Sequence, residues 1–270
     1  MCKVLLDLSE QSLIRAIEEN ACEFLLTLGR SGGGEERDEQ EIQWIIGGAP
    51  IAYHNCVVRA HLATGAVEEA ILASIQRFRA HSVPGSWHVG PSMYPPNIGE
   101  RLIEHGFVSG GREPGMAVDL HVLPEQISIP PAFVVEQVCD EQQLRIWTHT
   151  LAQGFGEGEI EANWVGQMYH TIGFGDQIHW RHYLGRWNGQ PVATTSLFMG
   201  AGVAGIYFVF TLPEARRQGV GAAITSAALQ DARRFGYRIG VLGASSMGYS
   251  VYRRLGFQEY CHIDIYEWKP

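Results

Sequence analysis

An apolar run, a loop with two glycines and an amphipathic helix follow one another in the second half of the chain. This succession limits the fold more than any other feature. The run covers residues 205–211, and apolar side chains then recur at helical spacing over residues 220–235. A strand without polar alternation is typical of the buried centre of a sheet. The sequence therefore predicts a central strand, a tight loop and a helix, in that order, within an α/β fold.

The loop Arg216–Gly221 has the composition of an anion-binding site. The first N–H groups of a helix have no partner within the helix and carry partial positive charge, so they attract phosphate. Gly219 lets phosphate oxygens approach the backbone, and two arginines add charged donors. The P-loop is excluded because no lysine follows the glycines, and the dinucleotide fingerprint because Ile224 occupies its third small position. Glycines can also serve tight packing alone, so the loop by itself is weak evidence.

Strand and helix patterns alternate through the rest of the second half. Asp140 is placed to cap a helix, and Asn188 with Gly189 is a strong hairpin signal. We expect strands at residues 133–138, 180–187, 192–199, 239–242 and 261–268, and helices at residues 140–151, 160–170 and 248–255. This order predicts an α/β fold with a mixed sheet flanked by helices.

Two segments resemble the GNAT superfamily of N-acetyltransferases. Phe210–Ala222 is similar to the acetyl-CoA signature of that superfamily, and Ser250–Phe257 is similar to its tyrosine-x-x-leucine-glycine-phenylalanine element. The two segments have the superfamily's usual order and separation, and the resemblance covers the second half of the chain. It implies acetyl-CoA as the cofactor and direct transfer of the acetyl group to a primary amine in a ternary complex.

The resemblance also implies roles for individual residues. The pyrophosphate would lie on the amides from Arg217 to Ala222, and the pantetheine arm along the preceding strand, one amide of which would polarise the thioester carbonyl. Tyr252 would protonate the departing thiolate, although a tyrosine on a short helix can also belong to the core. The implied cofactor-binding residues are Val209, Phe210, Thr211, Arg216, Arg217, Gln218, Gly219, Val220, Gly221, Ala222 and Ser245.

The chain departs from the family pattern at two places. Where many members have a cofactor-contacting asparagine, this chain has Ser245, a shorter donor. Where many members have a glutamate base on the central strand, Tyr207 is the only polar side chain. Either a neutral amine attacks directly, or the base comes from Glu157, Glu159, Glu161, His149, His170, His179 or His182. Aromatic candidates for the wall of an acceptor pocket are Phe155, Trp164 and Tyr169.

The first half carries a weaker copy of the same pattern. Leu102–Phe107 is similar to the segment 252–257, but leucine stands in place of the tyrosine. The expected phosphate loop, Arg59–Glu69, has one glycine and two acids that would repel a pyrophosphate. We therefore expect two tandem GNAT-like folds: a degenerate, catalytically silent lobe at residues 1–122, a proline-rich linker at 123–131 and the acetyltransferase domain at 132–270. In the first lobe we expect a strand at residues 4–6, a helix at 10–28, a flexible loop at 30–38 and a surface loop at 87–96.

Composition narrows the possible partners. A formal net charge of -9 and a pI near 5.6 argue against nucleic acid or an anionic membrane as a partner. The five cysteines are scattered, so we expect neither disulfides nor a metal site. No leader or membrane-spanning pattern occurs, and we expect a soluble, cytoplasmic protein. The acceptor, a small-molecule amine or a protein amine, is left open, as are two alternatives: a non-catalytic acyl-CoA sensor or interaction protein, and an acyltransferase that uses a longer acyl-CoA.

Overall fold

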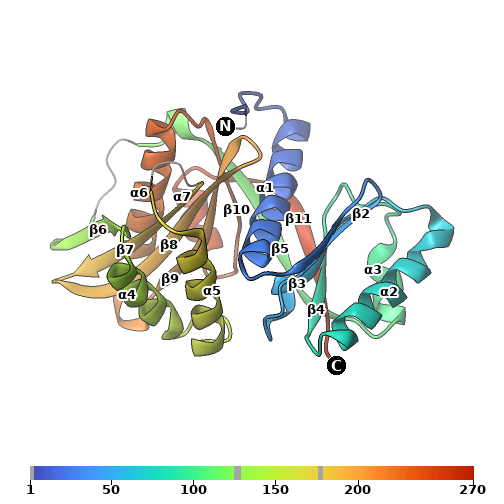
Figure 1. The fold of residues 1–270 in the computed structure, drawn as a ribbon. Coiled ribbons are helices and arrows are strands. Elements are labelled where there is room, and N and C mark those ends of the chain that lie inside the picture. Colours follow the sequence, from blue (N-terminus) through green and yellow to red (C-terminus); the bar gives the residue numbers. More distant parts are fainter. Residues whose placement is uncertain (1–2, 125–128, 176–178) are drawn as a thin grey trace. The chain divides into compact units, whose positions relative to one another are not determined.

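The chain divides into two compact units, each built from two stretches of sequence. The computed structural model describes residues 3–124, 129–175 and 179–270, and its helices and strands are labelled in Figure 1. Unit 1 comprises Met1–Asn20 and Met116–Tyr260, and unit 2 comprises Ala21–Gly115 and Cys261–Pro270. Each unit contains a mixed sheet with helices, which confirms the predicted fold class. Among the described residues, no helix is long and apolar enough to span a bilayer.

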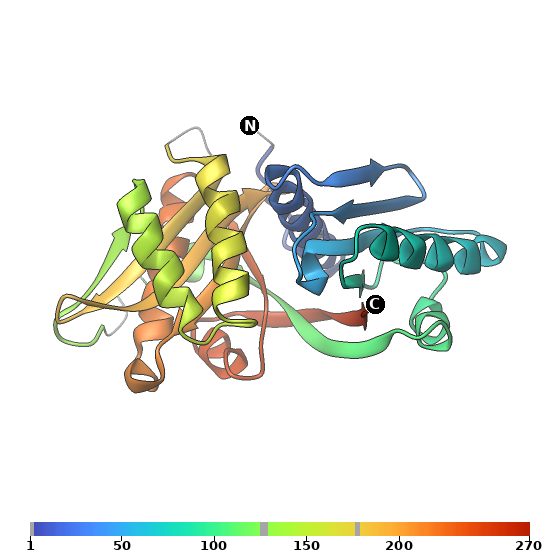
Figure 2. The same cartoon turned by 60° about the horizontal axis from the view of Figure 1, so that its bottom comes forward.

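In unit 1 the strands lie in the order β5-β10-β9-β8-β7-β6. β10 runs parallel to β9, whereas β9, β8, β7 and β6 are antiparallel neighbours. Helices α4 and α5 lie side by side (Figures 1 and 2), and α6 contacts β7, β8 and β9. The elements are β5 (Val108–Asp119, in unit 1 from Met116 onward), β6 (Phe133–Gln137), α4 (Glu141–Ala152), α5 (Glu159–Ile172), β7 (Trp180–Trp187), β8 (Gln190–Gly200), β9 (Val203–Thr211), α6 (Val220–Arg234), β10 (Ile239–Gly243) and α7 (Tyr249–Arg254).

The alternation of side chains along β7 assigns α4 and α5 to one face of this sheet and α6 to the other. The Tyr183 hydroxyl donates a 2.6 Å hydrogen bond to Asp231 of α6. His182, the preceding residue of the strand, stacks on Tyr169 of α5 with 3.7 Å between the ring centroids. Because successive side chains of a strand point to opposite faces, the sheet of unit 1 lies between two helical layers.

The local predictions for the second half are confirmed. The Asp140 carboxylate accepts the backbone N–H of Gln143 at 2.8 Å, so it caps α4. Asn188 and Gly189 both have positive φ, the geometry of the predicted hairpin turn between β7 and β8. The predicted strands and helices after residue 132 all occur, with ends displaced by at most three residues. Residues 125–128 of the predicted linker lie outside the described residues.

In unit 2 the strands lie in the order β1-β2-β3-β4-β11. β3 and β4 are parallel, and the other neighbours are antiparallel. The buried side chains of Phe78, Trp87 and Phe107 belong to one apolar core. The elements are α1 (Glu10–Ser31, in unit 2 after Asn20), β1 (Glu35–Asp38), β2 (Ile42–Ile46), β3 (Asn55–Ala60), α2 (Val67–Ala80), β4 (Gly85–Val89), α3 (Ile98–Glu104) and β11 (Gln258–Trp268, in unit 2 from Cys261 onward).

The two halves of the chain share one order of elements. The series β1-β2-β3-α2-β4-α3-β5 corresponds, element by element, to β7-β8-β9-α6-β10-α7-β11. In both series the first three strands are antiparallel neighbours, and the third strand pairs in parallel with the fourth. This correspondence supports the predicted internal repeat.

The last strands of the two series are exchanged. β11 pairs with β4 through Asp264–Trp268, so the end of the chain completes the sheet of unit 2. The end of β5 lies beside β10, where the Leu120 N–H donates to the Arg238 carbonyl at 2.7 Å. The compact units therefore differ from the expected division into residues 1–122, 123–131 and 132–270. The expected division follows the position of the prolines, whereas the compact units follow strand pairing between distant parts of the sequence.

Three local predictions for the first half are wrong. Residues 4–6 form no strand, and the Leu5 N–H donates to the Gly202 carbonyl instead. The segment 30–38 is not wholly a loop, because its second part is β1, paired with β2. Trp87 does not lie in a surface loop: it is a fully buried residue of β4, and its indole N–H donates to Ser74 Oγ at 3.1 Å.

Two buried histidines predict that each unit loses stability in mild acid. Burial lowers the pKa of His54, in unit 2, to about 4 and that of His182, in unit 1, to about 3. In the unfolded chain the pKa of both is near 6.5, so the unfolded state takes up protons first as the pH falls below 6.5. The stability that is present above this pH is then lost. From pH 8 to pH 5 we expect the free energy of unfolding of each unit to fall by about 2 kcal/mol from this source.

Urea unfolding at pH 8 and pH 5, followed by tryptophan fluorescence, measures this loss. His54→Leu serves as a comparison because, in the described chain, neither ring nitrogen of His54 has a hydrogen-bond partner to lose. In this variant the pH dependence of unit 2 should shrink by about 2 kcal/mol. A pH dependence that is identical in the wild type and the variant would contradict the assignment.

Candidate active site

In the described chain, β9 pairs with β8 over its whole length but with β10 over only part of it. Its pairing with β8 extends to Thr211, whereas within the described chain its register with β10 comprises Ala204 and Gly205. Val209–Thr211 therefore lie on a part of β9 that is paired on one side. Every second N–H of such a strand points away from its neighbour, where an extended ligand can bind it as an added strand does.

A bulge precedes this part of β9. Opposite Thr194–Ser196, β9 has one residue more than β8. Phe208 takes up the extra residue with φ of +49°, a left-handed conformation that is strained for a side-chain-bearing residue. Its ring lies on the face of α4 and α5, with centroids 5.5 Å from Phe155 and 6.2 Å from Trp147. The bulge changes the direction of the backbone immediately before Val209–Thr211.

The start of α6 is open to a ligand. The helix begins at Val220, directly after Gly219 with φ of +84°, and no side chain caps its first N–H groups. A Cβ at Gly221 would lie 3.5 Å from Thr211 Oγ1, an ordinary contact, so packing does not require glycine there. Without a bulky side chain at this position, the amides stay accessible to an oxygen ligand. Arg216 lies beside them and donates from Nε to the Thr211 carbonyl at 2.9 Å.

Tyr252 lies on α7 and is buried. Its ring meets Phe257 edge to face with 5.9 Å between centroids, and a side chain on Gly248 would collide with it. Burial raises the pKa of Tyr252 to about 12, so the phenol keeps its proton throughout the physiological range. Ser245 lies in the turn before this helix, where its Oγ accepts the Gly248 N–H at 3.2 Å. The structure thus gives Ser245 a role in that turn, and its contact with the cofactor stays a prediction.

The candidate bases differ in their surroundings. His182 is 2% exposed, lies 2.9 Å from Ser196 Oγ through Nδ1 and is neutral because burial lowers its pKa. Glu161 is also buried, and its carboxylate accepts the Glu157 N–H at 2.9 Å, which fixes the loop between α4 and α5. His179 lies 2.8 Å from the Met199 carbonyl. None of these three side chains belongs to β9, the central strand on which many family members carry their glutamate.

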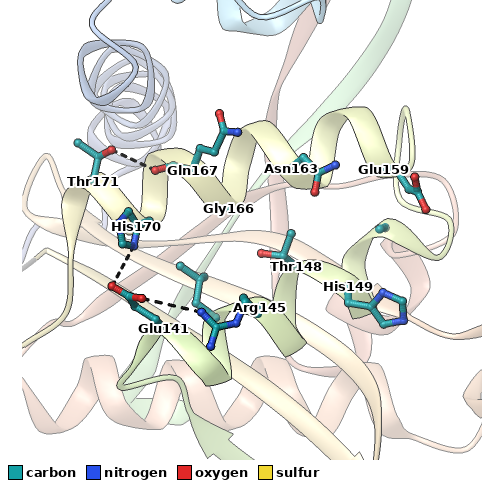
Figure 3. Close-up of a pocket in the computed structure, with 12 residues that line it drawn as sticks. Glu141, Arg145, Thr148, His149, Glu159, Asn163, Gly166, Gln167, His170 and Thr171 are labelled. Carbon is teal, nitrogen blue, oxygen red and sulfur yellow. Dashed lines mark hydrogen bonds and ion pairs between the residues drawn. The ribbon is translucent and has the colours of Figure 1, made fainter.

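A cavity of about 760 Å³ lies in the groove between α4 and α5 (Figure 3). Glu141 lies between His170 and Arg145 at one end of it, while His149 and Glu159 lie toward the other end. None of the predicted cofactor-binding residues lines this groove. The cavity is therefore separate from the candidate active site. Three of the predicted bases line it: His149, Glu159 and His170.

The predicted catalytic and cofactor-binding residues lie on three parts of unit 1. Residues 209–211 form the one-sided end of β9, and residues 216–222 form the loop and first turn of α6. Tyr252 and Ser245 lie on or just before α7. Of the aromatic candidates, Phe155 and Tyr169 contact Phe208, and Trp164 is partly buried on α5. Their roles in binding and catalysis remain predictions.

Comparisons with solved structures agree with the fold of the chain. A GCN5-related N-acetyltransferase from Kribbella flavida is similar in structure, with a TM-score of 0.71, 20% identity, and coverage of 92% of this chain and 95% of that chain. A functionally unknown conserved protein from Staphylococcus epidermidis has a TM-score of 0.66 and 16% identity, covering 87% and 93% of the two chains. A tandem GNAT protein from the clavulanic acid biosynthesis pathway has a TM-score of 0.57 and 14% identity, covering 84% and 78%. At these identities the likeness shows the fold.

The sequence itself supplies the assignment. No curated protein matches the chain. The model of the acetyltransferase (GNAT) family, however, matches residues 145–257, which include the one-sided end of β9, the loop before α6 and Tyr252. The chain therefore contains a domain of the GNAT acetyltransferase family and is an acyltransferase.

Proposed function

We propose that this protein transfers the acetyl group of acetyl-CoA to a primary amine by direct attack of the amine on the thioester. One observation carries the proposal: the one-sided end of β9 and the uncapped first turn of α6 belong to one continuous segment, Val209–Ala222. This segment offers strand amides to an extended ligand arm and helix amides to a phosphate. The matching family model covers the whole segment.

The residues fit acetyl-CoA as the donor, which would supply the acetyl group as a thioester. The amides of Arg217–Ala222 would bind the pyrophosphate at the start of α6, where the helix dipole favours negative charge. Val209–Thr211 would bind the pantetheine arm, and one amide after the bulge would donate to the carbonyl oxygen as charge develops on it. Arg216 and Arg217 would add positive charge around the phosphates.

Tyr252 would supply the proton that the leaving sulfur needs. Its pKa of about 12 lies well above that of a thiol, about 8.5, so full transfer to a free thiolate is unfavourable in the unliganded site. The phenol therefore acts best as a hydrogen-bond donor that gives up its proton only as the C–S bond breaks. The attacking nitrogen loses one proton in the same reaction, so the sum is an amide and a free thiol.

The first repeat would be catalytically silent. The first turn of α2 carries Glu68 and Glu69, whose charges oppose a phosphate at that helix start. Leu102 of α3 is fully buried where the second repeat has its tyrosine. Both observations favour a single cofactor site per chain, in the second repeat.

An assay of thiol release tests the proposal. Acetyl-CoA is mixed with the protein and, separately, an amino acid, spermidine, kanamycin or a lysine-containing peptide, and free coenzyme A is measured with a thiol reagent. Release that depends on one amine, with an acetylated product seen by mass spectrometry, would support the proposal. Binding of acetyl-CoA without release for any amine would contradict it and favour a non-catalytic sensor. Faster release from a longer acyl-CoA would assign the enzyme a different donor.

A further inference from the structure

A fully buried asparagine of α1 connects to the central strand of unit 1. Asn20 is 0% exposed, and its Nδ2 donates to the Gly200 carbonyl at 2.9 Å. Its Oδ1 accepts the hydroxyl proton of Tyr207 on β9 at 2.7 Å. The approach is close enough that a side chain on Gly205 would collide with Asn20. Asn20 and Tyr207, 187 residues apart in sequence, thus form a contact that also requires a glycine at position 205, and all three residues belong to unit 1.

The two hydrogen bonds fix the direction of the Tyr207 proton. Because the Asn20 amide gives its N–H to a backbone carbonyl, its oxygen must face the tyrosine. The Tyr207 hydroxyl is then the donor in their shared bond. Toward any other group this hydroxyl can act only as an acceptor, since its single proton is already committed.

The position of Tyr207 suggests what it accepts from. The residue follows Ile206, where the described register of β9 with β10 has ended, and it precedes the bulge at Phe208. It lies opposite Ser196, which bonds His182 on the face of α4 and α5, so its side chain shares that face. Val209, the first of the predicted carbonyl-binding positions, is two residues away, at most about 7 Å along the chain.

We infer that Tyr207 Oη accepts a hydrogen bond from the N–H of the acceptor amine, and that Asn20 positions this oxygen. The inference rests on the proposed function and adds the residue that recognises the acceptor. Tyr207 neither gains nor loses a proton in the step. The amine nitrogen forms the new C–N bond with its lone pair, and the C–S bond breaks. The leaving sulfur takes a proton from Tyr252, the nitrogen gives one to water, and water returns a proton to Tyr252. Tyr207 is the binding residue, and Asn20 acts through it.

Steady-state kinetics of Tyr207→Phe, Asn20→Ala and the double variant test the pair, with the amine that turns over fastest in the thiol-release panel. We expect each single variant to raise KM for the amine about tenfold, the effect of one lost hydrogen bond. The dissociation constant of acetyl-CoA should stay within about twofold, as should kcat. The double variant should be no worse than the worse single variant, because both changes remove one interaction.

Tyr183→Phe is the matched control. This tyrosine also donates a partly buried hydrogen bond, to Asp231, but on the face of α6. In urea unfolding, the Tyr183→Phe variant should lose about as much free energy of unfolding as Tyr207→Phe does. Its KM for the amine should equal that of the wild type. The inference would be overturned by an unchanged KM in Tyr207→Phe or by KM increases of the two single variants that multiply in the double variant. Weaker acetyl-CoA binding by the variants would also overturn it. Each of these results would leave the proposed function standing. A wild type that releases no thiol with any amine would overturn the proposed function and this inference together.

Discussion

Replacing Gly221 by aspartate is expected to weaken acetyl-CoA binding at least about 100-fold, or about 2.7 kcal/mol, while leaving the fold intact. Gly221 is in the first turn of α6, where the amides are uncapped. A carboxylate there would face the bound pyrophosphate and compete for the same N–H groups. The substitution is tolerable for the protein, because a Cβ at this position meets only Thr211 at an ordinary distance.

The Gly221→Asp variant should therefore be at least as stable as the wild type and yet bind acetyl-CoA more weakly. An acid in the first turn of a helix stabilises it by about 0.3–1 kcal/mol, so the melting temperature of Gly221→Asp should not fall. Gly221→Ala is the control, since it adds a Cβ without charge and should keep the affinity within a few-fold. Calorimetric titration with acetyl-CoA measures all three proteins. If the aspartate variant binds as tightly as the alanine variant, the pyrophosphate does not lie at this helix start.

Replacing Tyr252 by phenylalanine should lower kcat about 100-fold or more, within the usual contribution of a general acid. The change removes one oxygen and keeps the ring that packs against Phe257. Acetyl-CoA affinity should therefore be nearly unchanged, and the loss should appear in the chemical step. Because the pKa of Tyr252 is about 12, no fall in rate from its ionisation is expected below about pH 10.

Tyr249→Phe provides the comparison on the same helix. Tyr249 lies one turn earlier on α7 and hydrogen-bonds Glu259, and it has no place in the proposed chemistry. Its loss should leave kcat within about twofold. Equal activity of Tyr252→Phe and the wild type would show that Tyr252 is a core residue and that the leaving thiolate takes its proton elsewhere.

The parts of the fold that were predictable depend on local chemistry. The Asp140 cap, the Asn188-Gly189 turn and the Gly219 loop each follow from what one or two residues do to the backbone near them. The loop before α6 could therefore be placed from sequence, and the structure puts the expected residues around one helix start.

The parts that were not predictable depend on distant pairing. Nothing local to residues 258–268 indicates that they pair with β4 rather than β10, so the exchange of last strands could not be foreseen. Trp87 is surrounded by glycine and prolines that suggest a loop, yet its ring fills the core of unit 2. Asn20 falls on the buried stripe of α1, and its contact with Tyr207 is formed only when the chain folds. A polar residue on an apolar helix face was the one available signal.

Calorimetric titration of acetyl-CoA into the wild type and Arg217→Glu tests whether the loop before α6 binds the cofactor, and it also counts the sites per chain. Arg217 lies in the loop before α6 with φ of +60°, next to the amides that would bind the pyrophosphate. We expect one site per chain in the wild type and its loss in the variant. Two sites would show that the first repeat also binds the cofactor. Binding that is indifferent to Arg217, or no binding at all, would contradict the proposed site.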